Sequence, residues 1–202
     1  MPRLVSSLAL ATAVGLCIVT RPASARDETD EPHETWLVPS LHSLGLMSVM
    51  RASEAYLWPE PFANTARFGY HYEQAFTRPP LFDTSLPLFR ADGDRWQINV
   101  VGHGLFGSEL YLRARVCRKP VWQALLFTTG ASALWEYGFE ANGVRPSGLD
   151  LVYTPLAGLV LGEGRFQLFR WASRLSPGAG RATLKAVADP LGELERLLGA
   201  PC

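Results

Sequence analysis

Two carboxylates end a long uncharged stretch of this chain. No charged residue occurs from Val121 to Trp135, and Glu136 and Glu140 then follow four residues apart. If the segment is helical, this spacing places both carboxylates on one face. A buried carboxylate costs several kcal/mol unless it is paired or hydrogen-bonded. The sequence therefore predicts that Glu136 has a specific polar partner.

Isolated polar residues recur at helical spacing on three apolar segments. Asn99 and His103 lie four residues apart on the first segment, and Asp150 and Thr154 lie four apart on the third. On the middle segment Ser132 lies one helical turn before the first carboxylate. Residues four apart share a helix face, so we expect the three segments to bring these side chains together. The predicted polar centre consists of Asn99, His103, Ser132, Glu136, Glu140, Ser147, Asp150, Thr154 and Glu163.

His103, Glu136 and Asp150 are the candidates for chemistry within this centre. His103 and Glu136 could form a general acid and base, and with Asp150 they offer three ligands for a metal ion. The same three side chains could simply lock three helices together. Glycines at 102, 104 and 107 flank the histidine and would allow another backbone to approach it closely. We expect His103 to be the partner of Glu136, and the alternatives are Arg113, Arg115 and Arg145.

Each candidate also has a purely structural explanation. His103 could be a satisfied core histidine, and Glu140 could be solvated at a helix end beside Asn142. Ser147 could cap a helix with Asp150 as the acidic member of a capping box. Residues 92–94, Asp-Gly-Asp, are typical of a turn, because the later ligand positions of a calcium loop are missing. The metalloprotease, nucleophile-elbow, P-loop and dinucleotide motifs are absent, so no reaction, metal or cofactor is predicted.

Hydrophobic spacing predicts an all-α fold, a compact bundle of about five to seven helices. We expect a helix over residues 35–57 that ends at the WPEPF sequence, and a strand or helical turn in FGYHYEQAF. A proline-rich connector at 77–94 leads to three core helices, over 96–116, over 121–140 and over 147–173 with a break at Pro155. LSPGAGRA is predicted to be a linker, and LGELERLL an amphipathic helix.

Four uncharged runs bear on membrane association, at residues 35–50, 96–108, 121–135 and 151–162. Each is shorter than the ~18–20 residues that a spanning helix needs. They fit buried core helices, or helices that lie partly in a membrane face. The GxxxG pattern at Gly158 and Gly162 permits close helix packing in lipid or in a soluble core.

The N-terminus has the pattern of a secretory signal peptide. Arg3 precedes an apolar run at residues 4–20, and Ala23-Ser24-Ala25 is a small-residue cleavage site. An uncleaved anchor is the alternative, and Leu16 disfavours lipid attachment at Cys17. Cleavage would remove two of 19 basic residues and none of 19 acidic ones, which leaves 17 against 19 and a net charge of −2. This charge argues against nucleic acid as a partner.

Export bears on localisation and on the cysteines. We expect the protein in the periplasm, or attached peripherally to an envelope membrane. Cys117 and Cys202 remain after cleavage, and an oxidising compartment allows them to pair. Free thiols or an intermolecular bridge are the alternatives. The expected parts of the chain are a signal peptide (1–25), an N-terminal helical segment (26–64), a core domain (65–175) and a C-terminal linker with an amphipathic helix (176–202).

Motifs in the core resemble domain-of-unknown-function family 3943, found in Gram-negative envelope proteins. The resemblance covers residues 65–175. Its motifs are Asp94-Arg95-Trp96-Gln97-Ile98-Asn99, Gly102-His103-Gly104, Gly107-Ser108, Trp135-Glu136-Tyr137 with Glu140, Pro146-Ser147, Asp150-Leu151, Thr154-Pro155, Gly158 and Leu161-Gly162-Glu163. The family usually has proline where this chain has Gly104. The resemblance implies that the polar centre is a family feature, and it carries no activity. The order His, Glu, Asp on successive apolar helices is also similar to membrane-associated families related to teicoplanin-resistance proteins, at the level of architecture alone.

Two classes of function remain open from the sequence. One is a non-enzymatic envelope protein, either a module that binds or packs against lipid or a membrane protein, or a soluble structural module. The other is an envelope hydrolase or transferase, with a lipid or cell-wall substrate, that uses His103 and Glu136 with or without a metal. An open pocket beside His103 would favour the enzyme, and a sealed centre would favour a structural role.

Overall fold

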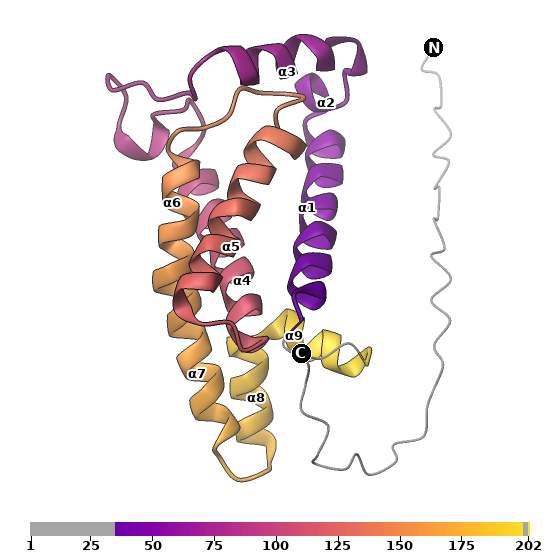
Figure 1. Ribbon diagram of the computed structural model, residues 1–202, viewed down its shortest axis with the longest axis vertical. Helices are drawn as coiled ribbons and strands as arrows, with labels where there is room; N and C mark the ends of the chain where they lie inside the picture. Colours follow the sequence, from indigo (N-terminus) through magenta and orange to yellow (C-terminus); the bar gives the residue numbers. More distant parts are fainter. Residues whose placement is uncertain (1–34, 200–201) are drawn as a thin grey trace, which may run out of the picture. The chain divides into compact units, whose positions relative to one another are not determined.

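The computed structural model describes residues 35–199 and residue 202, and confirms the all-α prediction for them (Figure 1). The predicted signal peptide lies outside these residues. The α-helices are α1 Leu37–Leu57, α2 Pro59–Phe62, α3 Phe68–Thr77, α4 His103–Val116, α5 Val121–Leu134, α6 Asp150–Ala157, α7 Glu163–Ser173, α8 Ala179–Ala188 and α9 Pro190–Leu197. Short 3-10 turns lie at η1, Thr65–Arg67, and η2, Leu88–Arg90.

Three π-helical stretches extend the core helices. They are η3 Ile98–Gly102, η4 Trp135–Phe139 and η5 Gly158–Gly162. Each continues directly into or out of an α-helix, so the chain is helical over 98–116, 121–139 and 150–173. The predicted break at Pro155 is therefore wrong. Proline lies inside α6, and the helix continues through the wider turns of η5 into α7.

The three core helices pack against one another, and the others surround them (Figure 1). Helix α4 contacts α5, α6, η5 and α7, while α1 lies against α4 and η4. The FGYHYEQAF segment forms helix α3 and not a strand. This helix packs against η4. Helices α7, α8 and α9 follow one another at the opposite end of the bundle. In the described part of the chain, no helix is long and apolar enough to cross a membrane.

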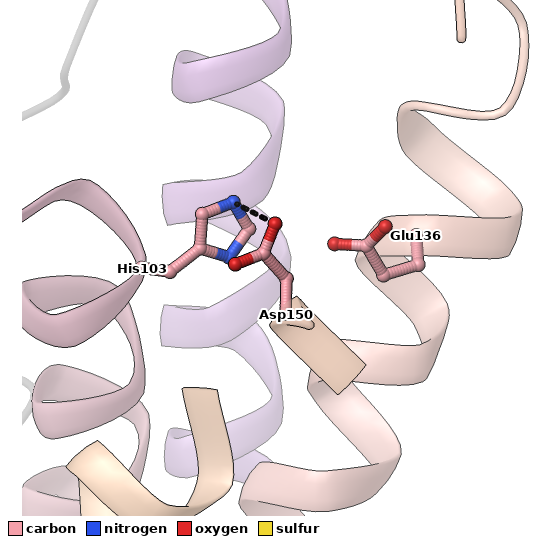
Figure 2. Close-up of side chains that lie close together, drawn as sticks. All are labelled: His103, Glu136 and Asp150. Atoms are coloured by element: carbon pink, nitrogen blue, oxygen red, sulfur yellow. Dashed lines mark ion pairs between the residues drawn. The ribbon is translucent and has the colours of Figure 1, made fainter. Parts of the chain in front are cut away.

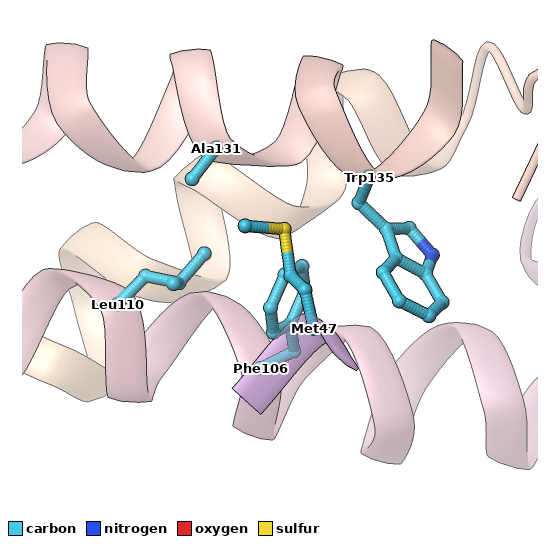
Figure 3. Close-up of a cluster of buried hydrophobic side chains, with 5 residues drawn as sticks. All are labelled: Met47, Phe106, Leu110, Ala131 and Trp135. Carbon is cyan, nitrogen blue, oxygen red and sulfur yellow. The ribbon is translucent and has the colours of Figure 1, made fainter. Parts of the chain in front are cut away.

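A small apolar cluster joins α1, α4 and α5 (Figure 3). Met47 of α1 packs with Phe106 and Leu110 of α4, Ala131 of α5 and Trp135 of η4. The rings of Phe106 and Trp135 have centroids 5.8 Å apart. Burial of such side chains stabilises the fold by about 1.5–3 kcal/mol each. This cluster fixes the helix ends that carry the candidate polar residues.

Glycines allow α4 and the 150–173 helix to approach closely. A Cβ atom on Gly107 would collide with the backbone carbonyl of Thr154, and one on Gly158 would lie 2.7 Å from the carbonyl oxygen of Gly107. A Cβ on Gly162 would lie 2.9 Å from the carbonyl oxygen of Ser108. The GxxxG pattern therefore acts in packing between these two helices, and brings Thr154 against His103.

A buried ionic network holds α9 to the bundle. Arg113 of α4 is 1% exposed and lies 2.8 Å from Asp189, which precedes α9, and 3.2 Å from Glu195 within it. His42 of α1 contacts both Glu195 and Glu109 of α4.

The linker predicted over LSPGAGRA is shorter than expected, because α8 already begins at Ala179, inside that sequence.

A disulfide bond joins Cys117 at the end of α4 to Cys202, with Cα atoms 4.8 Å apart. It therefore connects the last residue of the chain to the segment between α4 and α5. The paired state was one of the alternatives that the sequence left open. All described residues belong to one compact unit.

Candidate functional site

Glu136 lies in η4 and is 1% exposed. One of its carboxylate oxygens, Oε2, accepts a hydrogen bond from the backbone N–H of Ser147 at 2.7 Å. The other, Oε1, is buried and has no hydrogen-bond partner among the described residues. The hydrogen-bond partner of Glu136 is thus a backbone amide, rather than His103 or one of the three arginines considered from the sequence. Arg113 pairs with acids on α4 and at α9, and Arg115 pairs with Glu163.

His103, the first residue of α4, is 6% exposed. Its Nδ1 lies 3.0 Å from the hydroxyl oxygen of Thr154, and its Nε2 lies 3.5 Å from Oδ2 of Asp150. Both partners come from α6, which the glycine contacts hold against α4. The histidine therefore has one ring nitrogen held by a hydroxyl and the other facing a carboxyl group.

The three candidates for chemistry lie in one buried cluster (Figure 2). Asp150 lies between His103 and Glu136, and the carboxyl group of Glu136 points toward it. A ligand atom can be chosen from each residue such that all three lie within 4.8 Å of one another. The direct His103–Glu136 pair considered from the sequence is replaced by an arrangement of three residues with Asp150 at its middle.

Asp92 is a member of this centre that sequence reasoning missed. The predicted turn is present, since Oδ1 of Asp92 accepts the backbone N–H of Asp94 at 3.0 Å. The same carboxylate also accepts the side-chain amide of Asn99 at 2.8 Å and the hydroxyl of Ser147 at 2.7 Å. The sequence predicts the turn, but nothing in its spacing shows that the connector folds back onto the Ser147 loop.

Backbone hydrogen bonds hold the connector in this position. The N–H of Leu81 donates to the carbonyl of Pro146 at 2.7 Å, and the N–H of Gly148 donates to the carbonyl of Leu81 at 2.8 Å. These two bonds flank Ser147. The connector between α3 and η3 is therefore attached to the loop that supplies Ser147 and Asp150, and it delivers Asp92 to the centre.

Burial shifts the ionisation of the cluster toward its neutral forms. Burial raises the pKa of Glu136 to about 8, and the negative charges of Asp92 and Asp94 add to this effect. The pKa of Asp150 rises to about 9 for the same main reason, with Glu136 and Asp92 contributing. Burial lowers the pKa of His103 to about 4. At neutral pH without a bound cation, the carboxyls are therefore largely protonated and the histidine is neutral.

A pocket of about 680 Å³ lies beside the cluster and is rich in acidic residues. Its lining includes Glu54, Asp94 and Glu140, and its apolar walls include Trp58 and Ile98. The pKa of Glu54 is raised to about 7 by burial, and burial together with the charge of Glu136 raises the pKa of Glu140 well above its ordinary value. Glu140 is therefore a wall of this pocket rather than a freely solvated helix end.

The structure brings most of the predicted polar residues together. Ser132 donates to the backbone carbonyl of Asp150 at 3.3 Å, and the hydroxyl of Ser147 accepts the N–H of Asp150 at 3.0 Å. Glu163 does not belong to the centre. It lies 13 residues after Asp150 on the same helix and accepts hydrogen bonds from Arg115 and Tyr111. At a rise of about 1.5 Å per residue, Asp150 and Glu163 are roughly 20 Å apart along the helix.

The fold and the site together define an all-α protein with a buried histidine–carboxylate centre. Residues 88–191 match the family DUF3943, described as a domain of unknown function. The match spans slightly more than half of the chain and includes every residue of the centre described above. The chain therefore belongs to this family. No curated protein and no solved structure matches the chain.

Proposed function

We propose that this chain is an exported, membrane-associated protein of a Gram-negative cell envelope that acts as a binding module, with lipid covering the outer faces of its core helices. The observation that carries the proposal is the distribution of charge on four helical segments, α1, 98–116, 121–139 and 150–162. Every exposed residue on these described segments is uncharged. Soluble helices have the opposite pattern, with apolar residues inside and charges outside.

The charged residues of these segments are turned inward. In α1, Arg51 donates to the backbone carbonyl of Phe139 and to the side chain of Asn142, and Glu54 lines the acidic pocket. In the other three segments, the acids and arginines are buried or half-buried. Large apolar side chains are exposed instead, among them Leu41, Val49, Leu105, Leu126, Leu156 and Val160. An apolar exterior of this extent favours contact with acyl chains.

Tryptophans lie near both ends of these apolar faces. Trp36 and Trp122 lie at the start of α1 and α5, and Trp36 stacks on Phe127 of α5 with ring centroids 5.3 Å apart. Trp58 follows the other end of α1, and Trp96 precedes η3. All four are between 38% and 60% exposed. Tryptophan is enriched at the boundary between lipid and water, so this placement supports lipid rather than a protein as the covering partner.

Vesicle flotation of the purified mature protein, residues 26–202, tests the proposal. We expect it to float with phosphatidylethanolamine–phosphatidylglycerol vesicles, and Leu156→Lys with Val160→Lys to reduce the bound fraction at least about tenfold, because a charge on a lipid-facing surface is costly. Thr183→Lys, on an exposed position of α8, is the matched control and should float like the wild type. A wild-type protein that stays with the aqueous fraction, alone or as an oligomer, would overturn the lipid assignment.

One observation favours the second candidate, a hydrolase or transferase. A neutral His103 beside protonated carboxyls is a potential base next to potential acids. The large acidic pocket, however, is lined by Glu140 and not by His103 or Asp150. Diethylpyrocarbonate treatment of the folded protein followed by peptide mapping separates the two functions. Rapid modification of His103 would favour the enzyme, whereas protection until unfolding would favour a module that admits only a small ion.

A further inference from the structure

Two buried carboxyl oxygens in the centre have no hydrogen-bond partner among the described residues. They are Oε1 of Glu136 and Oδ1 of Asp150, and both residues are 1% exposed. An unsatisfied buried polar atom costs about 1–3 kcal/mol. Each carboxyl group is already held through its second oxygen, Glu136 by the N–H of Ser147 and Asp150 by the contact to His103. The unused oxygens therefore call for a further electropositive group.

We propose that His103, Glu136 and Asp150 bind one divalent transition-metal cation of the zinc class. Two carboxylates and one neutral imidazole balance the charge of such an ion, so the ion and its three ligands together would be electrically neutral, which favours a buried position. One nitrogen and two oxygen donors suit Zn²⁺, Mn²⁺ or Fe²⁺ better than the all-oxygen sites that Mg²⁺ and Ca²⁺ prefer.

The groups around the three residues orient them for binding. Thr154 holds Nδ1 of His103, which leaves Nε2, the nitrogen that faces Asp150, available as a ligand. Ser147 holds Glu136 through its N–H, and its hydroxyl links the loop to Asp92. Hydrogen bonds of this kind fix ligand orientation in metal sites. Asp150 lies between His103 and Glu136, and the carboxyl group of Glu136 points toward it (Figure 2).

The distances require only a small contraction. The three ligand atoms lie within 4.8 Å of one another. Ligands at about 2.1 Å from one ion can be at most about 4.2 Å apart. Side-chain rotations of roughly 1 Å therefore close the site without moving the helices. Glu136 lies in η4, which continues α5, and Asp150 begins α6, so the two carboxyl ligands come from different helices.

The acidic pocket offers a route for a cation to reach the centre. Glu54, Asp94 and Glu140 line it, and Glu140 lies one helical turn beyond Glu136. The four carboxyl groups of the lining outnumber its one arginine, Arg95, so the pocket offers oxygen contacts to a passing cation. In the metal-free centre, protons neutralise the carboxyls, and binding of the metal would displace them.

Calorimetric titration of the tag-free, chelator-treated full-length protein in detergent tests the proposal without requiring lipid binding. We expect one Zn²⁺ or one Mn²⁺ per chain, and no comparable binding of Mg²⁺. His103→Gln, Glu136→Gln and Asp150→Asn should each weaken binding at least about tenfold. Glu163→Gln, which alters an acid of the same helix outside the centre, should bind like the wild type.

Two results would overturn the proposal. One is a wild-type protein that binds neither ion stoichiometrically. The other is binding that survives in all three variants, which would place the metal at another histidine such as His42. If a variant fails to fold by circular dichroism, the absorption spectrum of the Co²⁺-loaded wild-type protein decides the matter. Bands of a nitrogen–oxygen site support the proposal, and the spectrum of hexaaqua cobalt rejects it.

Discussion

The carboxyl group of Glu136 accepts the backbone N–H of Ser147 at 2.7 Å, a hydrogen bond that joins η4 to the loop before α6. In a capping box, this N–H would go to the acidic residue three positions later, which here is Asp150. The structure contains only half of that box, the hydroxyl of Ser147 that accepts the N–H of Asp150. Because the N–H of Ser147 donates to Glu136, the carboxyl group of Asp150 does not bond to it and faces His103 instead.

Replacement of Glu136 by glutamine should stabilise the metal-free protein at alkaline pH. The pKa of this carboxyl is about 8 in the fold and 4.5 in its ordinary state. The folded protein therefore retains a proton that the unfolded chain releases, and the wild type loses free energy of unfolding as the pH rises from about 4.5 to about 8. Glutamine accepts the Ser147 N–H without this loss. We expect a gain of about 1–3 kcal/mol at pH 9.

Thermal melts of both proteins at pH 5 and pH 9, with chelator present, measure this effect. A gain of 1 kcal/mol corresponds to about 2–4 °C for a chain of this size. The two proteins should melt together at pH 5, where the carboxyl is protonated in the fold. If the variant melts far below the wild type at both pH values, Glu136 is an ionised strut and the pKa assignment is wrong.

Removal of the Ser147 hydroxyl should weaken the attachment of the connector. Ser147→Ala loses the acceptor for the Asp150 N–H and the donor to Asp92. The expected cost is about 1–2 kcal/mol, measured by urea unfolding. Ser53→Ala is the control, because this exposed serine bonds only to the carbonyl of Val49 in its own helix. An equal effect in both variants would show that the Ser147 contacts contribute nothing specific.

The close approach of α4 to α6 makes one glycine sensitive to a single methyl group. In Gly107→Ala the new Cβ would meet the backbone carbonyl of Thr154, which has no room to move aside. We expect a loss of about 1–3 kcal/mol or more. Gly130→Ala on α5 has no atom within 4 Å of the new methyl and should gain about 0.5–1 kcal/mol. Urea unfolding of the pair checks both the size and the opposite signs, and stabilisation by both would contradict the packing.

The ionic network at α9 should fail locally when Arg113 is removed. Arg113→Ala leaves the carboxylate of Asp189, which is 0% exposed, with the guanidinium of Arg196 at 3.3 Å and the backbone N–H of Gly192 at 2.9 Å. Loss of one member of a buried ion pair costs about 3–5 kcal/mol. Hydrogen exchange should show faster opening of residues 190–197 than of α5. Arg181→Ala, whose contact is a single 3.4 Å bond to a carbonyl, should leave α9 protected. Uniform loss of protection would mean that the network supports the whole bundle.

Helical spacing was sufficient to predict the core helices and most of the centre. The four-residue intervals from Asn99 to His103, and from Asp150 to Thr154, place those pairs on common faces. Isolated polar residues in apolar runs are expensive to bury alone, so the sequence also predicts that the three segments share one polar centre. Spacing is a local property, and these inferences need nothing beyond it.

Only the tertiary structure decided which residues are partners. Asp92 lies in the centre because the connector hydrogen-bonds to the residues on both sides of Ser147. Glu163 lies outside it, because this residue is roughly 20 Å further along the helix than Asp150 and bonds to Arg115. The network from Arg113 to α9 joins residues 76 positions apart in sequence. Contacts of this kind depend on how whole helices pack. The sequence by itself therefore determines the faces that must be buried and the polar groups that need partners, whereas the packing of α1, the connector and α9 determines which partners they receive.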